Sequence, residues 1–176
     1  APIHFADNKP SVDEILPTDL FAPLVVIDVR DKCESNPDYG LTVKDIKDWE
    51  AIHGRLPDGA VVIMSTGWSQ KWDDIKAYQN QDENGKMHFP GFTKKSNEFL
   101  VNERNIKGIG IDNLSVDPGA ANGFPAHLVT NGAGKWHLEN VANTHLLPEN
   151  GAFVIVAPIK IEGGSGGQVR IFAIIP

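Results

Sequence analysis

Two segments of the sequence each place a side chain that can bind a metal ion among apolar residues. His127 lies within Phe124–Leu128, and Glu139 lies within Trp136–Val141. A carboxylate in an apolar site is costly unless it is paired, hydrogen-bonded, protonated or metal-bound. An imidazole and a carboxylate are also a partial ligand set for zinc or manganese. Their separation of 12 residues is not that of a local ligand motif, so a metal site and a hydrogen-bonded core pair both stay open.

The glycine-rich stretch Ile161–Arg170 surrounds Ser165 with glycines. A phosphate loop needs Lys followed by Ser or Thr and then a helix N-terminus, whereas here a β-branched strand follows. A nucleophile elbow needs a turn between a strand and a helix, so that interpretation fails as well. Two interpretations remain: a tight connection between the last two strands, or glycines that let the backbone approach a ligand, with Ser165 forming a hydrogen bond.

Asp112, Ser115 and Asp117 follow a short apolar run at Gly108–Ile111. Loops at the carboxyl ends of strands in α/β sheets often carry ligand sites. Asx turns and helix caps account for such residues equally well. The sequence therefore leaves a ligand role and a structural role open for these three residues.

The strands that must position these residues follow from the hydrophobic patterning. Short, β-branched and nearly continuous apolar runs predict five buried strands, at residues 24–29, 60–64, 108–111, 153–157 and 169–175. The polar residues 73–89 predict a surface loop or an inserted excursion.

Helices are predicted between these strands. Thr42 is a candidate cap for a helix over residues 43–52, with Asp45 at the capping-box position and Ile52 on its apolar face. Two further helices are expected, one from Thr93 to about residue 104 and one that begins near Pro125. Strands that alternate with helices indicate an α/β layered domain.

The composition excludes several classes of partner. The 176 residues fit one domain, and the net charge of −7 argues against nucleic acid and anionic membranes as partners. Cys33 is the single cysteine, so no intramolecular disulfide or thiolate metal cage is possible. A lone thiol suits a reducing compartment, and we expect a cytoplasmic protein. No stretch approaches the roughly 18 apolar residues of a membrane span.

Several stretches, in this order, resemble the cyclase-type metal-dependent hydrolases, a family that includes bacterial kynurenine formamidases and isatin hydrolases. The similar segments cover nearly all of the chain: Val25–Val29, Thr66–Trp68, His88–Phe92, Gly110–Asp117, the His127/Glu139 pair and Ile161–Arg170. Met87–Phe92 and Glu139–Asn143 look more like isatin hydrolases than like formamidases. The resemblance implies a swivelling β/β/α fold, with mixed sheets and packed helices, in one domain over residues 1–176.

The metal-binding motif of that family is H-x-G-T-H-x-D-x-P-x-H, in which the first two histidines and the aspartate bind the catalytic metal. Ala1–Phe5 is similar to the tail of this motif, and His4 falls on its final histidine. By this alignment the aspartate would precede Ala1. We therefore expect the sequence to start inside the motif, with further ligands upstream and an N-terminal segment of the domain missing.

The resemblance also implies roles for individual residues. His127 and Glu139 would bind a divalent metal, Zn or Mn, or form hydrogen bonds around its water, while His4 would transfer a proton. Glu139 would also take part in catalysis. Trp68 and Phe92 are candidate walls for a planar aromatic substrate, although ordinary core burial explains them equally well, and Ser165 is a candidate hydrogen-bonding group.

The activity implied is hydrolysis of the C–N bond of a cyclic or N-acyl aromatic amide, as in isatin hydrolases. One alternative is an arylformamidase that acts on N-formylkynurenine. The other is a non-catalytic binding protein, if the chain truly starts at Ala1. The resemblance further implies a homodimer or a larger homo-oligomer.

Overall fold

The computed structural model describes residues 1–175 and contains a six-stranded mixed sheet of order β6-β5-β3-β1-β7-β8. Four neighbouring strands run parallel: β1 (Phe21–Asp28), β3 (Val61–Ser65), β5 (Gly108–Ile111) and β6 (Trp136–Leu138). The other two, β7 (Ala152–Pro158) and β8 (Val169–Ile174), pair antiparallel. All five strands predicted from the sequence are therefore present. The short strands β2 (Gly40–Leu41) and β4 (Gly91–Phe92) form a separate pair.

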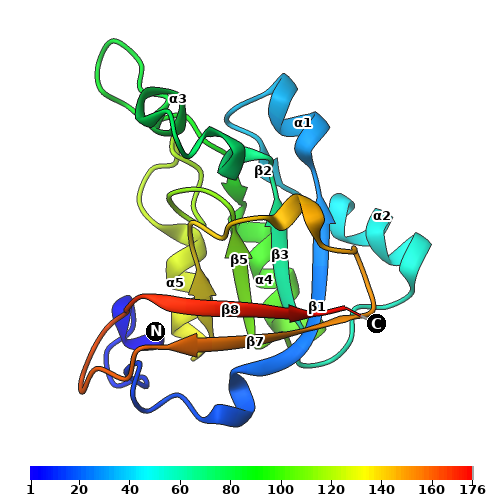
Figure 1. Ribbon diagram of the computed structural model, residues 1–176, viewed down its shortest axis with the longest axis vertical. Helices are drawn as coiled ribbons and strands as arrows, with labels where there is room; N and C mark the ends of the chain where they lie inside the picture. The colour runs from blue at the N-terminus through cyan, green and yellow to red at the C-terminus, as the bar shows by residue number, and fades with distance from the viewer. Residues whose placement is uncertain (176) are drawn as a thin grey trace.

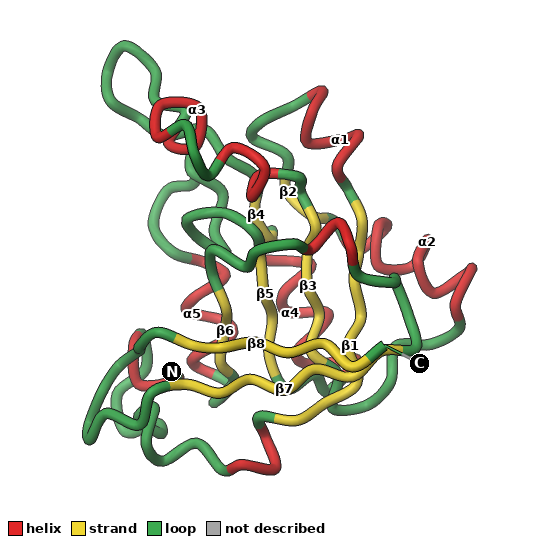
Figure 2. Tube along the Cα trace, in the orientation of Figure 1, coloured by secondary structure: helices red, strands yellow, loops and turns green. Residues whose placement is uncertain are grey.

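Strand β1 belongs to two layers at once. Its residues 24–28 pair with β3, whereas residues 21–24 pair with β7. As a result β7 and β8 cross in front of the parallel strands, and helices α4 (Lys94–Arg104) and α5 (Pro125–Gly132) lie behind them (Figures 1 and 2). The architecture is a strand layer on a strand layer on a helix layer, which confirms the predicted β/β/α fold.

Two helices of the helix layer begin at a threonine whose side chain caps the helix. In α2 (Val43–His53) the Thr42 side chain accepts a hydrogen bond from the backbone of Asp45, whose carboxylate accepts one from the backbone of Thr42. This reciprocal arrangement confirms the capping box. Thr93 also caps α4 (Lys94–Arg104), but only its own side chain forms the capping hydrogen bond. Helix α5 runs over Pro125–Gly132.

Two hydrophobic clusters occupy the spaces between the three layers. Val25 and Ile27 of β1 face the helices together with Ile46, Leu100 and other side chains. Leu24 and Val26, which alternate with them, face the layer of β7 and β8. Both faces of β1 are thus buried, which explains why its sequence is continuously apolar.

The described segments outside these layers are short. Helix α1 (Arg30–Ser35) follows β1, and α3 (Ile75–Gln79) lies in the polar excursion that stands away from the sheet (Figure 1). Four 3₁₀ turns complete the described elements, at Pro2–His4, Pro17–Asp19, Trp68–Lys71 and Thr144–Leu146.

The expected apolar face of α2 is wrong at one position, because Ile52 is 77% exposed near the helix end. None of the described helices has the length and apolar character needed to span a membrane.

Asp45 joins three parts of this region and yields a stability prediction. Its carboxylate accepts hydrogen bonds from Thr42 and the Tyr39 hydroxyl, and it pairs with Lys32. Burial would raise the pKa of Asp45, but the hydrogen bonds from Lys32 and Thr42 outweigh it and lower the pKa. The stabilisation is therefore fully present above the unfolded pKa of about 3.9 and is lost as the pH falls through the lower folded pKa.

We expect Asp45→Asn to lower the free energy of unfolding by about 1–2 kcal/mol at pH 7. The difference from the unmodified protein should shrink as the pH falls from about 4 through the lower folded pKa of Asp45, because the carboxylate is protonated first in the unfolded state and then in the folded state. Urea unfolding at several pH values measures it. Asp48→Asn, on the exposed side of α2, is the control. An equal effect of both substitutions on the free energy of unfolding would contradict the stabilising role of the Asp45 carboxylate.

Candidate metal centre

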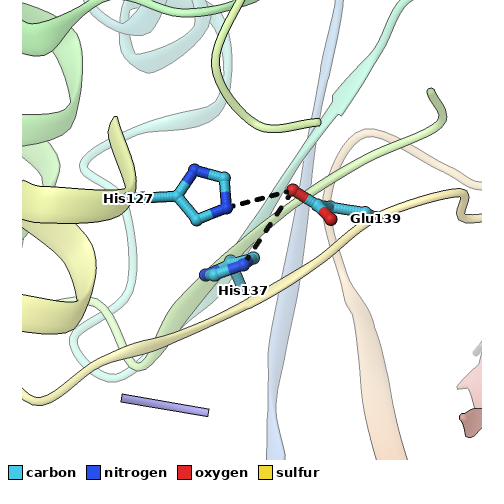
Figure 3. A group of neighbouring side chains, drawn as sticks. All are labelled: His127, His137 and Glu139. Atoms are coloured by element: carbon cyan, nitrogen blue, oxygen red, sulfur yellow. Dashed lines mark ion pairs between the residues drawn. The ribbon is translucent and has the colours of Figure 1, made fainter. Parts of the chain in front are cut away.

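Three ligand-type side chains converge at the edge of the sheet formed by β6. His127 comes from α5, His137 from β6, and Glu139 directly follows β6. One ligand atom from each lies within 4.8 Å of the others. The Glu139 Oε1 atom is 3.4 Å from Nε2 of His127 and 3.9 Å from Nε2 of His137 (Figure 3).

Asp117 fixes the position of His127. Its carboxylate accepts hydrogen bonds from the backbone N–H groups of Ala126 and His127, at 2.6 and 3.2 Å, and so serves the N-terminus of α5. Nδ1 of His127 lies 2.6 Å from the same carboxylate. Because a carboxylate only accepts, Nδ1 carries the proton and the Nε2 atom faces Glu139.

The backbone around β6 aims the other two donors. Trp136 and Leu138 are buried in the cluster between the strand layers, so the side chain of His137 between them points the opposite way. Glu139 is held by a 3.1 Å hydrogen bond from the backbone N–H of Val116 to its Oε1 atom.

The protonation states of the three groups differ. Burial lowers the pKa of His127, but hydrogen bonds with Asp117 and Glu139 outweigh it and raise the pKa to about 9. Burial and the charge of His127 lower the pKa of His137 to about 3, so that imidazole is neutral. Burial would raise the pKa of Glu139, yet the hydrogen bond from His127 and the positive charge of His127 lower it. Two imidazoles and one carboxylate form a donor set that fits a divalent zinc- or manganese-type ion.

His4 lies beside these donors. Its ring centroid is 5.8 Å from that of His127 and 6.1 Å from that of His137. Burial and the positive charge of His127 lower the pKa of His4. The structure thus brings together the three residues for which the sequence suggested metal binding or catalysis, His4, His127 and Glu139.

A cleft of about 1200 Å³ extends from this group between the two strand layers. His4, His137 and Glu139 line one part of it, and apolar side chains of the strands, such as Ile63 and Val154, line much of the rest. Imidazole and carboxylate groups at the mouth of an apolar cleft suit a ligand with an apolar body and a polar reactive group.

The glycine-rich stretch forms the connection between β7 and β8 and borders this cleft. A Cβ atom on Gly167 would lie 2.8 Å from Ile159, and one on Gly164 would lie 3.0 Å from Val12. The carbonyl of Gly164 also accepts a 2.8 Å hydrogen bond from the backbone of Val12. The strand-connection interpretation is therefore confirmed, and Ser165 lies exposed at the cleft.

Trp68 and Phe92 lie elsewhere. Trp68 is 2% exposed, packs with Tyr78 and Phe89, and donates a 2.8 Å hydrogen bond from Nε1 to the Tyr78 carbonyl. Phe92 is 0% exposed in the cluster between sheet and helices. Neither side chain lines the cleft, so their burial favours packing roles, and substrate contact stays a prediction.

Sequence reasoning missed His137 and left Asp117 undecided. The apolar neighbours of His137 in a short strand predict that its side chain faces away from theirs, but three residues are too few for a reliable period.

Asp112 has a structural role: its fully buried carboxylate accepts four hydrogen bonds, from the backbone and hydroxyl of Thr66, the backbone of Gly67 and the hydroxyl of Thr144.

Comparisons with known proteins show which family the chain is similar to. A family model described as putative cyclase matches residues 1–118. Isatin hydrolase from Roseibium aggregatum is 38% identical over 184 aligned positions, which cover 100% of this chain and 69% of that protein. Isatin hydrolase A from Labrenzia aggregata, bound to benzyl benzoate, superposes with a TM-score of 0.94 at 38% identity, over 99% of this chain and 70% of the other. An isatin hydrolase bound to the product analogue thioisatinate gives 0.94 at 36% identity, over 100% and 70%.

Proposed function

Because this chain belongs to the family of putative cyclases, we propose that it is a metal-dependent hydrolase that cleaves the C–N bond of isatin or a similar cyclic aromatic amide. The observation that carries the proposal is the convergence of His127, His137 and Glu139 on one point beside His4. The 38% identity to an isatin hydrolase over the whole chain supports the substrate class.

We propose that His127, His137 and Glu139 hold a Zn²⁺ or Mn²⁺ ion. A bound divalent ion supplies Lewis acidity and lowers the pKa of water towards neutrality. The protein supplies orientation: Asp117 keeps a proton on Nδ1 of His127, so Nε2 is the nitrogen that would bind the ion after it releases its own proton.

Hydrolysis of a cyclic amide requires two proton movements. Water loses a proton as its oxygen adds to the carbonyl carbon, and the nitrogen gains one as the C–N bond breaks. Glu139 is a carboxylate at the donor cluster and accepts the first proton. His4 borders the same cleft, and its imidazole takes up the proton that water released and passes it to the leaving nitrogen, so the two proton movements balance.

The test is a substrate panel of isatin, N-formylkynurenine and a simple lactone, applied to protein expressed from its complete gene. We expect isatin to be hydrolysed fastest, the activity to disappear on chelation, and Zn²⁺ or Mn²⁺ to restore it. Metal-loaded protein that leaves isatin intact would refute the proposal, and faster turnover of N-formylkynurenine would favour an arylformamidase.

His4→Ala should lower kcat for isatin about 10²-fold or more, because the leaving nitrogen loses its proton donor. The bound metal content should stay unchanged, since His4 is not among the three proposed ligands. His53→Ala is the matched control, as His53 pairs with Glu149 on the surface. Full activity of the His4 variant with its metal retained would eliminate the proton-transfer role.

We also propose that two copies associate through the outer face of β7 and β8. Phe153 and Ile155 lie opposite Ile174 and Phe172 in the strand register, and Phe21 stacks on Phe153. All five side chains are exposed, and contiguous exposed apolar surface of this kind marks interaction sites.

Phe172→Lys should convert a dimer into a monomer in light scattering coupled to size exclusion. Ile52→Lys, which alters an exposed apolar residue on α2, should leave the assembly unchanged. Dimers that persist in the Phe172 variant would place the interface elsewhere.

A further inference from the structure

The two histidines of the candidate metal centre have partners of opposite character on the nitrogen that faces away from Glu139. Nε2 is the nitrogen nearest to Glu139 in both rings, so Nδ1 is left for another partner. In His127 this partner is the carboxylate of Asp117, which only accepts hydrogen bonds. In His137 it is Nδ2 of Asn131, which lies 3.4 Å from Nδ1 and only donates. The position of the ring proton therefore differs between the two imidazoles.

The orientation of the Asn131 amide follows from a second contact at the end of α5. Nδ2 donates a 3.1 Å hydrogen bond to the carbonyl oxygen of Lys135. An oxygen atom in this place would face another oxygen, so the atom between Lys135 and His137 is the amide nitrogen. Asn131 is 0% exposed, and its Oδ1 atom has no hydrogen-bond partner among residues 1–175. The amide thus keeps this orientation although it leaves a buried acceptor unpaired, which is costly.

This contact determines which tautomer His137 adopts. A ring nitrogen that accepts a hydrogen bond carries no proton, so the proton of His137 lies on Nε2. A proton on Nδ1 would instead place two N–H groups opposite each other. Nε2 lies 3.9 Å from Oε1 of Glu139 (Figure 3), and a carboxylate on that side favours the same tautomer.

Binding of an ion through Nε2 of His137 requires the other tautomer, because a nitrogen that binds a metal carries no proton. Nδ1 then becomes a donor, and metal-binding histidines usually donate this second N–H to an acceptor. A half turn of the Asn131 amide brings Oδ1 beside Nδ1 and breaks the hydrogen bond to Lys135. Asn131 is therefore arranged for the metal-free form of His137, whereas Asp117 provides the acceptor that a metal-bound His127 needs.

We propose that Asn131 is a positioning residue that holds the proton of His137 on Nε2, and that its amide turns when His137 binds the ion. The inference rests on the proposed function for the presence of an ion. The location of the proton in the metal-free protein does not depend on that function. Asn131 therefore opposes ion binding by His137, and an acceptor in its place should strengthen it.

Nitrogen-15 NMR of histidine-labelled protein, expressed from its complete gene, tests the proposal, because the chemical shifts distinguish protonated from unprotonated ring nitrogens. In the metal-free protein at neutral pH we expect Nε2 of His137 to carry the proton. Addition of Zn²⁺, which is diamagnetic, should move the proton to Nδ1. A proton on Nδ1 in the metal-free protein would overturn the proposal, as would a tautomer that stays unchanged once Zn²⁺ is bound.

Asn131→Asp replaces the donor with an acceptor of the same size. The proton of His137 should then lie on Nδ1 without metal, and the affinity for Zn²⁺, measured by competition with a chelating dye, should rise about tenfold. Asn122→Asp adds the same charge at an exposed position before α5 and should change neither quantity.

A packing role of Asn131 predicts the opposite sign. Weaker Zn²⁺ binding by Asn131→Asp, or an unchanged tautomer of His137 in this variant, would overturn the proposal. If this variant does not fold, the tautomers of the unmodified protein with and without Zn²⁺ decide the question. A proton on Nε2 of His137 in a protein that binds no Zn²⁺ would uphold the role of Asn131 in the metal-free form and refute the proposed metal site.

Discussion

Glutamine in place of Glu139 is expected to lower kcat/KM for isatin about 10³-fold, the largest effect on activity that the structure predicts. Gln matches Glu in size but carries no negative charge and accepts no proton at neutral pH. Its amide group would also place N–H donors where Oε1 now faces Nε2 of His127 and His137. Initial rates at several isatin concentrations, together with the metal content of the purified protein, measure the loss.

Glu149→Gln is the matched control for this experiment. Glu149 is an exposed carboxylate that pairs with His53, so its substitution should leave kcat/KM within about twofold, in line with the small value of surface ion pairs. A Glu139 variant with the activity of this control would remove the carboxylate from the reaction and from the metal site.

Asparagine in place of Asp112 should cause the largest loss of stability, about 2–4 kcal/mol in the free energy of unfolding. Each oxygen of the carboxylate accepts one backbone N–H and one hydroxyl hydrogen bond, from Thr66 on one side and from Gly67 and Thr144 on the other. An amide would point its NH₂ group at one of these donor pairs and leave that pair without an acceptor inside the protein.

Chemical denaturation at neutral pH measures this effect. Thr144→Val removes one hydrogen bond to Asp112 and the one that Thr144 accepts from the buried Ser65 hydroxyl, and should cost about 1–2 kcal/mol. Asp58→Asn, at an exposed position, should cost nearly nothing. If Asp112→Asn were no worse than Asp58→Asn, the hydrogen bonds around Asp112 would not stabilise the fold.

The strands were predictable because β1, β3 and β5 are buried on both faces, which makes their sequences continuously apolar. Helix α2 was equally predictable from the sequence, since Thr42 and Asp45 form a local capping box. Strand β6 was missed because its three residues include a histidine that points towards other polar groups. The pairing of β1 with two strand layers could not be predicted from the hydrophobic pattern. No feature of the β1 sequence shows that its two halves pair with different strands.

The candidate site was predicted only in part, because some of its contacts join segments that are distant in sequence. His127 and Glu139 were noticeable as polar residues in apolar surroundings, and the family resemblance placed His4 with them. His137 and Asp117 join the site through contacts between α5, β6 and the segment after β5, which are distant in sequence. Trp68 and Phe92 show the converse: aromatic character alone does not distinguish a pocket wall from a core residue.

Strand β1, which pairs with both strand layers, separates the part of the fold that carries the proposed metal site from the hairpin of β7 and β8. Evolution can change these two parts independently. Strand β6, which carries the proposed ligand His137, lies at one edge of the sheet, whereas β7 and β8 attach to the other side of β1, with β5 and β3 between β6 and β1. Altered side chains or loop lengths in the hairpin of β7 and β8 would reshape the cleft without displacing the proposed metal ligands. Divergence within such a scaffold can thus change the shape of the cleft while the arrangement of His127, His137 and Glu139 is kept.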